Sequence, residues 1–351
     1  MLLHRPMFVA IGFLWFLASC GIAKAEPVSL YVSSGDTNAV LAYDGVTGAF
    51  QRTFASGGGL SEPEGVVFGP DGNLYVSSRP AQVLRYDGKT GKFLGVFASG
   101  HGLEDPAGIA FGGPDNDLYV SSGIPDSGIG GNQILRFDGK TGAFKAVLDP
   151  SNVGGLNDPE GMRFGPDGLL YVESTPEEGA GAVLRYNPAT NTFVDKFVKE
   201  SGAGAIEDPT DLTFGPGGDL FASSAASSEV KRYDGATGAF KSTFITAGLG
   251  GLHEAEGMTF GPNGNLFVAS ELGNAIQQYD GQTGASLGEF VKAGSGGLAM
   301  PALLTFGPAA SPIPLPPAAL SGLPMIGALA AVRTWCSWRR RRSEGGVSRG
   351  T

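Results

Sequence analysis

The sequence predicts an all-β chain that forms a six-bladed β-propeller of four-stranded blades. A Phe-Gly pair recurs at steps of 43, 53, 50, 46 and 46 residues, beginning at Phe68, Phe111, Phe164, Phe214, Phe260 and Phe306. A fixed period in this range is typical of four-stranded propeller blades. Each repeat also contains four short apolar runs bounded by turn residues, which is the pattern expected of four strands.

The second repeat shows the expected strands, which we name a, b, c and d: residues 65–68, 74–77, 83–86 and 92–97. The a–b turn is Gly-Pro-Asp-Gly, in which proline fixes φ and glycine accepts positive φ. The c–d turn is Asp-Gly-x-Thr-Gly, which starts at Asp44, Asp87, Asp138, Asp234 and Asp280, with Asn187-Pro in the remaining copy. These loops are short and offer one carboxylate each, so turn capping is favoured over calcium binding.

The ends of the repeat region predict how the ring closes. Residues 30–54 supply strands b, c and d with no a strand before them, and residues 303–306 supply an a strand with no b strand after it. The two fragments complete one blade, which joins the ends of the ring and leaves no gap between its first and last blades.

Charge and cysteine content limit the possible functions. Residues 26–311 contain 33 acidic and 16 basic side chains, a formal charge of −17. Such a surface argues against a nucleic-acid partner and can attract cations. The two cysteines, Cys20 and Cys336, lie in the terminal segments. Strand pairing must therefore close the repeat region without a disulfide.

Residues 1–25 are predicted to form a signal peptide with a helical apolar segment. A short basic region is followed by the apolar run 7–19 and by the small-x-small pattern Ala23-Lys-Ala25. We expect cleavage after Ala25. The alternative is lipoprotein processing, because Leu17-Ala-Ser-Cys20 is similar to a bacterial lipobox.

The C-terminal segment is predicted to be a sorting or membrane segment over residues 313–342, after a linker at 308–312 and before a polar tail at 343–351. An apolar stretch of 20 residues, 313–332, is just long enough to span a bilayer as a helix, and the basic run Arg339–Arg342 follows it. The run Ile313-Pro-Leu-Pro resembles the Val-Pro-Leu-Pro variant of PEP-CTERM tails. That resemblance implies an exosortase-type sorting enzyme as partner and export to the envelope surface or matrix of a Gram-negative bacterium. A plain single-span anchor is the alternative.

The propeller domain is expected over residues 26–307, and residues 28–307 resemble NHL-repeat and gluconolactonase-like propellers. The resemblance is carried by Pro63-Glu-Gly-Val-Val-Phe-Gly-Pro-Asp-Gly-Asn-Leu-Tyr-Val76 and its copies. It implies the six-bladed fold, but it is a weak guide to function because this fold hosts enzymes, ligand readers and scaffolds.

A ring of alternating glutamates is the main candidate site. Four residues before each repeat phenylalanine the chain carries Glu64, Ala107, Glu160, Thr210, Glu256 and Ala302. On a six-bladed ring, Glu64, Glu160 and Glu256 are expected near the axis about 120° apart, and converging carboxylates suit Ca²⁺ or Mg²⁺. The gluconolactonase-like resemblance implies a divalent ion at this place. The alternative is that these glutamates are solvated or accept backbone hydrogen bonds.

Other polar residues near this ring have weaker claims to a function. His101 and His253 fall in d–a loops, and the virginiamycin B lyase type of propeller, which uses a histidine base beside a metal, makes them candidates; surface histidines are the simpler interpretation. Residues two positions before the ring are predicted to form turns: Glu62, Asp105, Asp158, Asp208 and Glu254. The arginines before the c-strand aromatics are expected to form surface ion pairs: Arg85, Arg136, Arg185 and Arg232.

Two functions are consistent with this sequence. The first is an exported, non-catalytic propeller that binds a surface or matrix ligand through the variable d–a and b–c loops, since variable loops on a rigid scaffold commonly carry binding. The second is a lactonase or lyase that depends on a divalent metal in the central channel.

Overall fold

The computed structural model describes residues 28–79, 81–123, 132–176, 180–202 and 204–308. The chain divides into two units, residues 1–310 and 311–351. The predicted signal peptide and the predicted C-terminal sorting segment lie outside the described residues. Within the described part of the chain, no helix has the length and apolar character needed to cross a bilayer.

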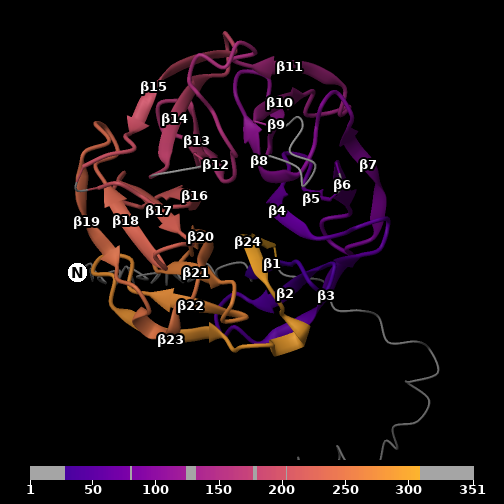
Figure 1. Ribbon diagram of the computed structural model, residues 1–351. Helices are drawn as coiled ribbons and strands as arrows, with labels where there is room; N and C mark the ends of the chain where they lie inside the picture. The colour runs from indigo at the N-terminus through magenta and orange to yellow at the C-terminus, as the bar shows by residue number, and fades with distance from the viewer. Residues whose placement is uncertain (1–27, 80, 124–131, 177–179, 203, 309–351) are drawn as a thin grey trace, which may run out of the picture. The chain divides into compact units, whose positions relative to one another are not determined.

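The described residues form six four-stranded antiparallel sheets arranged around a central axis, which confirms the predicted all-β propeller (Figure 1). From the inner to the outer strand, blades 1 to 3 are β24 (Pro301–Pro308), β1 (Val28–Ser34), β2 (Ala39–Asp44), β3 (Phe50–Ser56); β4 (Pro63–Phe68), β5 (Leu74–Ser78), β6 (Gln82–Tyr86), β7 (Phe93–Ser99); and β8 (Pro106–Gly112), β9 (Asp117–Ser122), β10 (Gln133–Phe137), β11 (Phe144–Leu148).

Blades 4 to 6 follow the same order from the inner to the outer strand. Their strands are β12 (Met162–Phe164), β13 (Leu170–Ser174), β14 (Ala182–Asn187), β15 (Thr192–Val198); β16 (Pro209–Phe214), β17 (Leu220–Ser224), β18 (Glu229–Tyr233), β19 (Phe240–Ile245); and β20 (Ala255–Phe260), β21 (Leu266–Ser270), β22 (Ala275–Tyr279), β23 (Ser286–Val291). Two single-turn 3₁₀ segments, η1 (Leu249–Gly251) and η2 (Ser295–Gly297), precede the inner strands β20 and β24.

The ring closes as predicted, by pairing the two ends of the repeat region in blade 1. Strand β24 pairs antiparallel with β1, with Val28 opposite Pro308 and Val32 opposite Leu304. The Tyr31 hydroxyl donates to the Pro308 carbonyl oxygen at 2.6 Å. The last described strand of the propeller therefore supplies the inner strand of its first blade.

Aromatic contacts between blades explain the repeated Phe-Gly pair. The aromatic side chain that follows the first leucine of each b strand packs edge-on against the repeat phenylalanine of the next blade, as Tyr75 does with Phe111 at a centroid distance of 4.8 Å. Phe267 of blade 6 makes the same contact with Phe306 of blade 1, at 5.1 Å. Because each aromatic pair crosses a blade boundary, the repeat phenylalanines hold neighbouring blades together. The pair of Phe267 and Phe306 does the same where the ring closes.

The c–d aspartates cap their turns, as predicted. In blade 2 the Asp87 carboxylate accepts hydrogen bonds from the backbone N–H and the hydroxyl of Thr90, at 2.8 and 2.7 Å. These bonds lower the pKa of Asp87. The turn ends at Gly91, whose φ is +74° and where a Cβ would stand 1.7 Å from the Phe54 carbonyl oxygen of the preceding blade. Glycine is required there because the turn packs directly on its neighbour.

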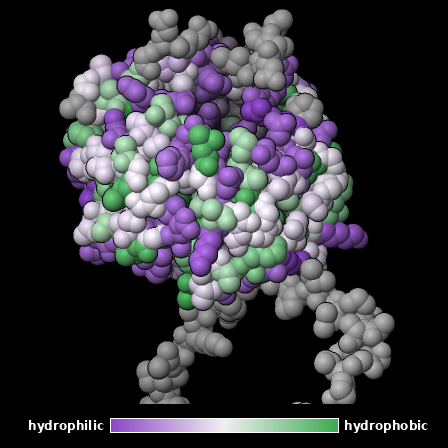
Figure 2. Space-filling view, turned by 60° about the horizontal axis from the view of Figure 1, so that its bottom comes forward, coloured by the Kyte–Doolittle hydropathy of each residue, from purple (hydrophilic) through white to green (hydrophobic). Residues whose placement is uncertain are grey.

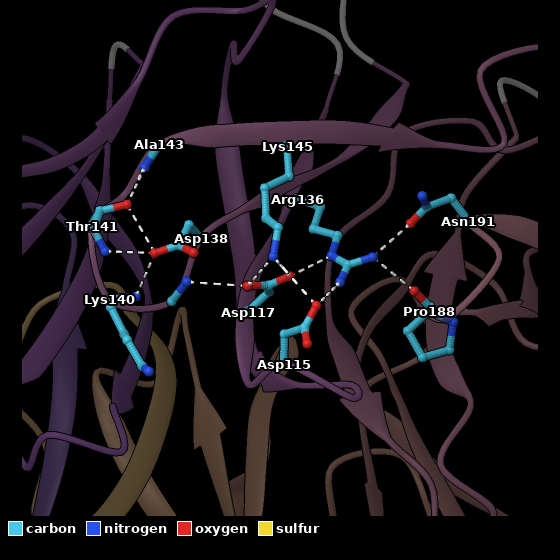
Figure 3. A network of polar contacts seen from close by, with 11 residues as sticks. Asp115, Asp117, Arg136, Asp138, Lys140, Thr141, Ala143, Lys145, Pro188 and Asn191 are labelled. Atoms are coloured by element: carbon cyan, nitrogen blue, oxygen red, sulfur yellow. Dashed lines mark hydrogen bonds and ion pairs between the residues drawn. The ribbon is translucent and has the colours of Figure 1, made fainter.

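Three of the four predicted arginine ion pairs form, those of Arg136, Arg185 and Arg232, and the pair of Arg136 is buried. Among the described residues Arg85 forms no ion pair, and its guanidinium instead lies over the Phe97 ring, 5.6 Å from the ring centroid. Arg136 is 8% exposed, its Nε donates to Asp117 at 2.6 Å, and Asp115 and Lys145 complete the ion cluster (Figure 3). The guanidinium also donates to the Pro188 carbonyl oxygen and to the Asn191 side chain in blade 4. This network joins blades 3 and 4 through their short turns, so its role is structural.

Candidate functional site at the channel mouth

All six residues of the predicted ring line one cavity, of about 430 Å³, on the face formed by the d–a and b–c loops. Glu64, Glu160 and Glu256 come from blades 2, 4 and 6, and Ala107, Thr210 and Ala302 from the blades between them. The structure thus brings the three predicted glutamates together in one cavity. The inner strands that carry or precede them surround the central axis in Figure 1.

A turn with a left-handed backbone conformation precedes each inner strand and positions the residue of the predicted ring beside the cavity. The residues two positions earlier all have left-handed backbone conformations, with φ between +39° and +49°: Glu62, Asp105, Asp158, Asp208, Glu254 and Met300. Proline follows most of them, and proline disfavours the right-handed helical conformation in the residue before it. The turn-forming role predicted for these acidic residues is therefore confirmed. The sixth copy carries Met300 at this position with the same conformation, so the turn does not require a charged side chain.

Arg79 is the one basic side chain among the described residues that line the cavity. It follows strand β5, and its guanidinium lies 3.0 Å from Glu64 Oε1, 3.5 Å from Glu62 Oε2 and 2.5 Å from Asp105 Oδ1. Three carboxylates from two blades therefore share a single cation. Burial raises the pKa of Glu64 to about 7, against the opposing charge of Arg79.

The other charged side chains that line the cavity, among the described residues, are acidic. Burial, followed by the charge of Glu64, raises the pKa of Glu160 well above its usual value. Burial, followed by the charges of Glu160 and Glu271, does the same for Glu256. Glu271 follows strand β21 and also lines the cavity. The free energy of this cavity would fall if a positively charged group entered and paired with these carboxylates.

The two candidate histidines lie away from the cavity lining. The exposed His101 ring stacks on Phe144, with ring centroids 4.3 Å apart. The His253 side chain is also exposed, and its backbone N–H donates to the Ser270 hydroxyl at 2.8 Å. Both residues thus have contacts that account for their positions within the loops.

The metal assignment stays a prediction. In the part of the chain that the structure describes, no three His, Cys, Asp or Glu side chains are gathered as a ready-made ligand set. Glu64, Glu160 and Glu256 share the cavity, but one oxygen of Glu64 already contacts Arg79. An ion bound by all three carboxylates would have to displace that contact.

Sequence reasoning missed two charged residues of the cavity lining, Arg79 and Glu271. It also missed three at the boundary of blades 4 and 5: Arg163, Glu173 and Asp211. A signal was present for two of them, because they interrupt the internal repeat. Glu173 replaces the first serine of Leu-Tyr-Val-Ser-Ser, and Asp211 replaces the glycine that follows the ring residue in the copies at Gly65, Gly108, Gly161 and Gly257.

Comparison with known proteins supports the fold alone. No protein-family model matches the chain, and no curated protein matches it. Among solved structures, the chain is similar to one in the crystal structure of a nidogen/laminin complex, with 13% identity, a TM-score of 0.64, and coverage of 81% of this chain and 100% of that one. It is also similar to a protein of unknown function from Bacteroides caccae, with 15% identity, a TM-score of 0.59, and coverage of 80% and 98%.

Proposed function

We propose that this protein is an exported, non-catalytic binding module whose channel mouth takes a positively charged group of a surface or matrix ligand. The observation that carries the proposal is the acidic cavity itself. Glu160, Glu256 and Glu271 line it, and the cation Arg79 is already shared among Glu62, Glu64 and Asp105. A ligand cation would meet carboxylates whose charges are mutually repulsive without it.

Two further features support a binding role. One similar structure was determined as a complex of nidogen with laminin. Binding residues also commonly lie in the loops of a rigid scaffold, and the cavity lies at such loops. On the face seen in Figure 2, hydrophobic residues are dispersed among hydrophilic ones and form no large apolar patch. Export rests on the predicted signal peptide, and an exosortase-type partner and Gram-negative envelope or matrix location rest on the PEP-CTERM resemblance.

Binding of cationic probes tests this function. Isothermal titration should show that spermidine and a short lysine-rich peptide bind, that an acidic peptide of equal length does not, and that added salt weakens binding. Glu160→Gln and Glu256→Gln should each weaken binding about tenfold or more, since hydrogen bonds to charged groups contribute about 1.5–3 kcal/mol. Glu289→Gln, on the exposed face of β23, is the matched control. Equal affinity for the acidic and basic peptides would contradict the proposal.

A divalent-metal-dependent lactonase or lyase is the second candidate, and the placement of Glu64, Glu160 and Glu256 in one cavity favours it. The all-oxygen donor set suits Ca²⁺ or Mg²⁺. This function requires one bound ion per chain, turnover on a panel of lactones, and loss of both when any of the three glutamates becomes glutamine. Binding of cationic peptides without metal or turnover would instead support the binding module.

A further inference from the structure

Strand β13 of blade 4 departs from the internal repeat at one position, where blade 2 has a serine that hydrogen-bonds to the next blade. In blade 2 the hydroxyl of Ser77 accepts from the Gly65 N–H at 2.6 Å and donates to the Ala107 carbonyl oxygen of the next blade at 2.7 Å. Blade 4 carries Glu173 instead of serine. The Gly161 N–H then donates to the Thr210 carbonyl oxygen of blade 5, at 3.0 Å.

The glutamate in this position is buried without a partner. Glu173 is 0% exposed, and neither carboxylate oxygen has a hydrogen-bond partner among the described residues. Asp211, on β16 of the next blade, is 1% exposed, and its Oδ1 is also unpartnered within the described part of the chain. Three buried carboxylate oxygens at one blade boundary thus lack a hydrogen-bond donor.

Glu173 and Asp211 both lie next to Gly161. The Glu173 N–H donates to the Gly161 carbonyl oxygen at 3.0 Å, and a Cβ on Gly161 would stand 2.9 Å from Asp211 Oδ1. Strands β13 and β16 pack together (Figure 1). Burial, followed by the charge of Asp211, raises the pKa of Glu173 well above its usual value.

Arg163, the ion-pair partner of Asp211, compensates this pair only in part. Its Nη2 lies 3.4 Å from Asp211 Oδ2, and its Nε donates to the Leu212 carbonyl oxygen at 3.1 Å. Asp211 Oδ2 also accepts from the Met258 N–H, at 2.9 Å. In the ionised form the three remaining oxygens are acceptors only, and burying such charged atoms unpaired carries a large desolvation cost. A cation bound between them would remove that cost.

We propose that Glu173 and Asp211 bind a buried calcium ion at the boundary between blades 4 and 5. Calcium accepts carboxylate and carbonyl oxygens in flexible geometry, which matches this all-oxygen set. Among the described residues, neither carboxylate lines the channel-mouth cavity, whereas Gly161 and Thr210 do. The ion would therefore sit behind the cavity wall and lock two blades together, independently of any ligand at the ring of glutamates.

Calcium binding by the purified full-length protein, after treatment with a chelator, tests this inference. One equivalent of Ca²⁺ should bind and raise the melting temperature. Glu173→Ser, which restores the serine of the repeat, and Asp211→Asn should each weaken Ca²⁺ binding at least tenfold. Glu64→Gln should leave it unchanged. Glu173→Ser should also melt above the wild type in chelator, because it removes the unpaired buried carboxylate.

Three outcomes would overturn the inference. They are absence of Ca²⁺ binding by the wild type, equal binding by the Glu173→Ser protein, and loss of binding in Glu64→Gln with retention in Glu173→Ser. If Glu173→Ser fails to fold, the nearly isosteric Glu173→Gln allows the same comparison. Binding of cationic peptides measured on the same proteins reports separately on the channel mouth, so either proposal can fail alone.

Discussion

Replacing Leu304 with alanine tests whether the ring is held closed by the strand that returns to blade 1. Leu304 is 1% exposed and packs in a core cluster with Leu30 and Val32 of blade 1 and Phe267 of blade 6. Truncating a buried leucine costs about 2–5 kcal/mol, because apolar contacts are lost and a cavity remains. Since a whole domain is stable by about 5–15 kcal/mol, this single change should remove a large share of that stability.

Urea denaturation of the propeller, followed by circular dichroism, measures this loss. Leu304→Ala should lower the free energy of unfolding by about 2–5 kcal/mol. The control is Leu287→Ala on the outer strand β23, where leucine is 54% exposed and the change should stay within about 0.5 kcal/mol. Equal stability of the two variants would refute closure through a packed β24.

Deleting β24 altogether extends the test. The deletion would leave β1 with a row of unpaired backbone groups, which is a template for aggregation. It would also remove Leu304 and the Phe306 ring that packs on Phe267. We expect an insoluble protein or one without a cooperative transition. A truncated propeller that melts like the intact one would show that closure does not depend on this strand.

Three further predictions follow from the described contacts and from the N-terminal sequence. Arg136→Met should destabilise the protein by about 2–4 kcal/mol in urea denaturation, because it leaves Asp117 buried with only Lys145 as counter-ion; Arg85→Met, at the same position in blade 2, should cost less than about 1 kcal/mol. Mass spectrometry of the exported protein should find cleavage after Ala25, and a diacylglyceryl group on Cys20 would contradict this. Folding raises the pKa of Glu64 from 4.5 to about 7, so the folded state binds this proton more tightly; stability should therefore increase as the pH falls from about 7 to about 4.5, and Glu64→Gln should flatten that part of the profile in thermal melts.

Local patterns in the sequence were sufficient for the fold and for the ring at the channel mouth. The Phe-Gly period gave the blade number, and the unmatched strands at the two ends gave the closure that β1 and β24 form. The ring was predictable because a propeller repeats the same backbone position around one axis, so spacing from Phe68 and its copies is enough to place Glu64, Glu160 and Glu256 in one cavity.

Tertiary structure decided which charges meet. Arg79 reaches Glu64 and also Asp105 of the next blade, and no local pattern sets the direction of such a long side chain. Glu173 and Asp211 stand 38 positions apart in the sequence, and they become neighbours because β13 packs against the inner strand of the next blade. The internal repeat determines where each backbone segment lies in the propeller. The pKa and the free energy of a buried carboxylate depend instead on the charges and donors around it, and several of these come from other blades.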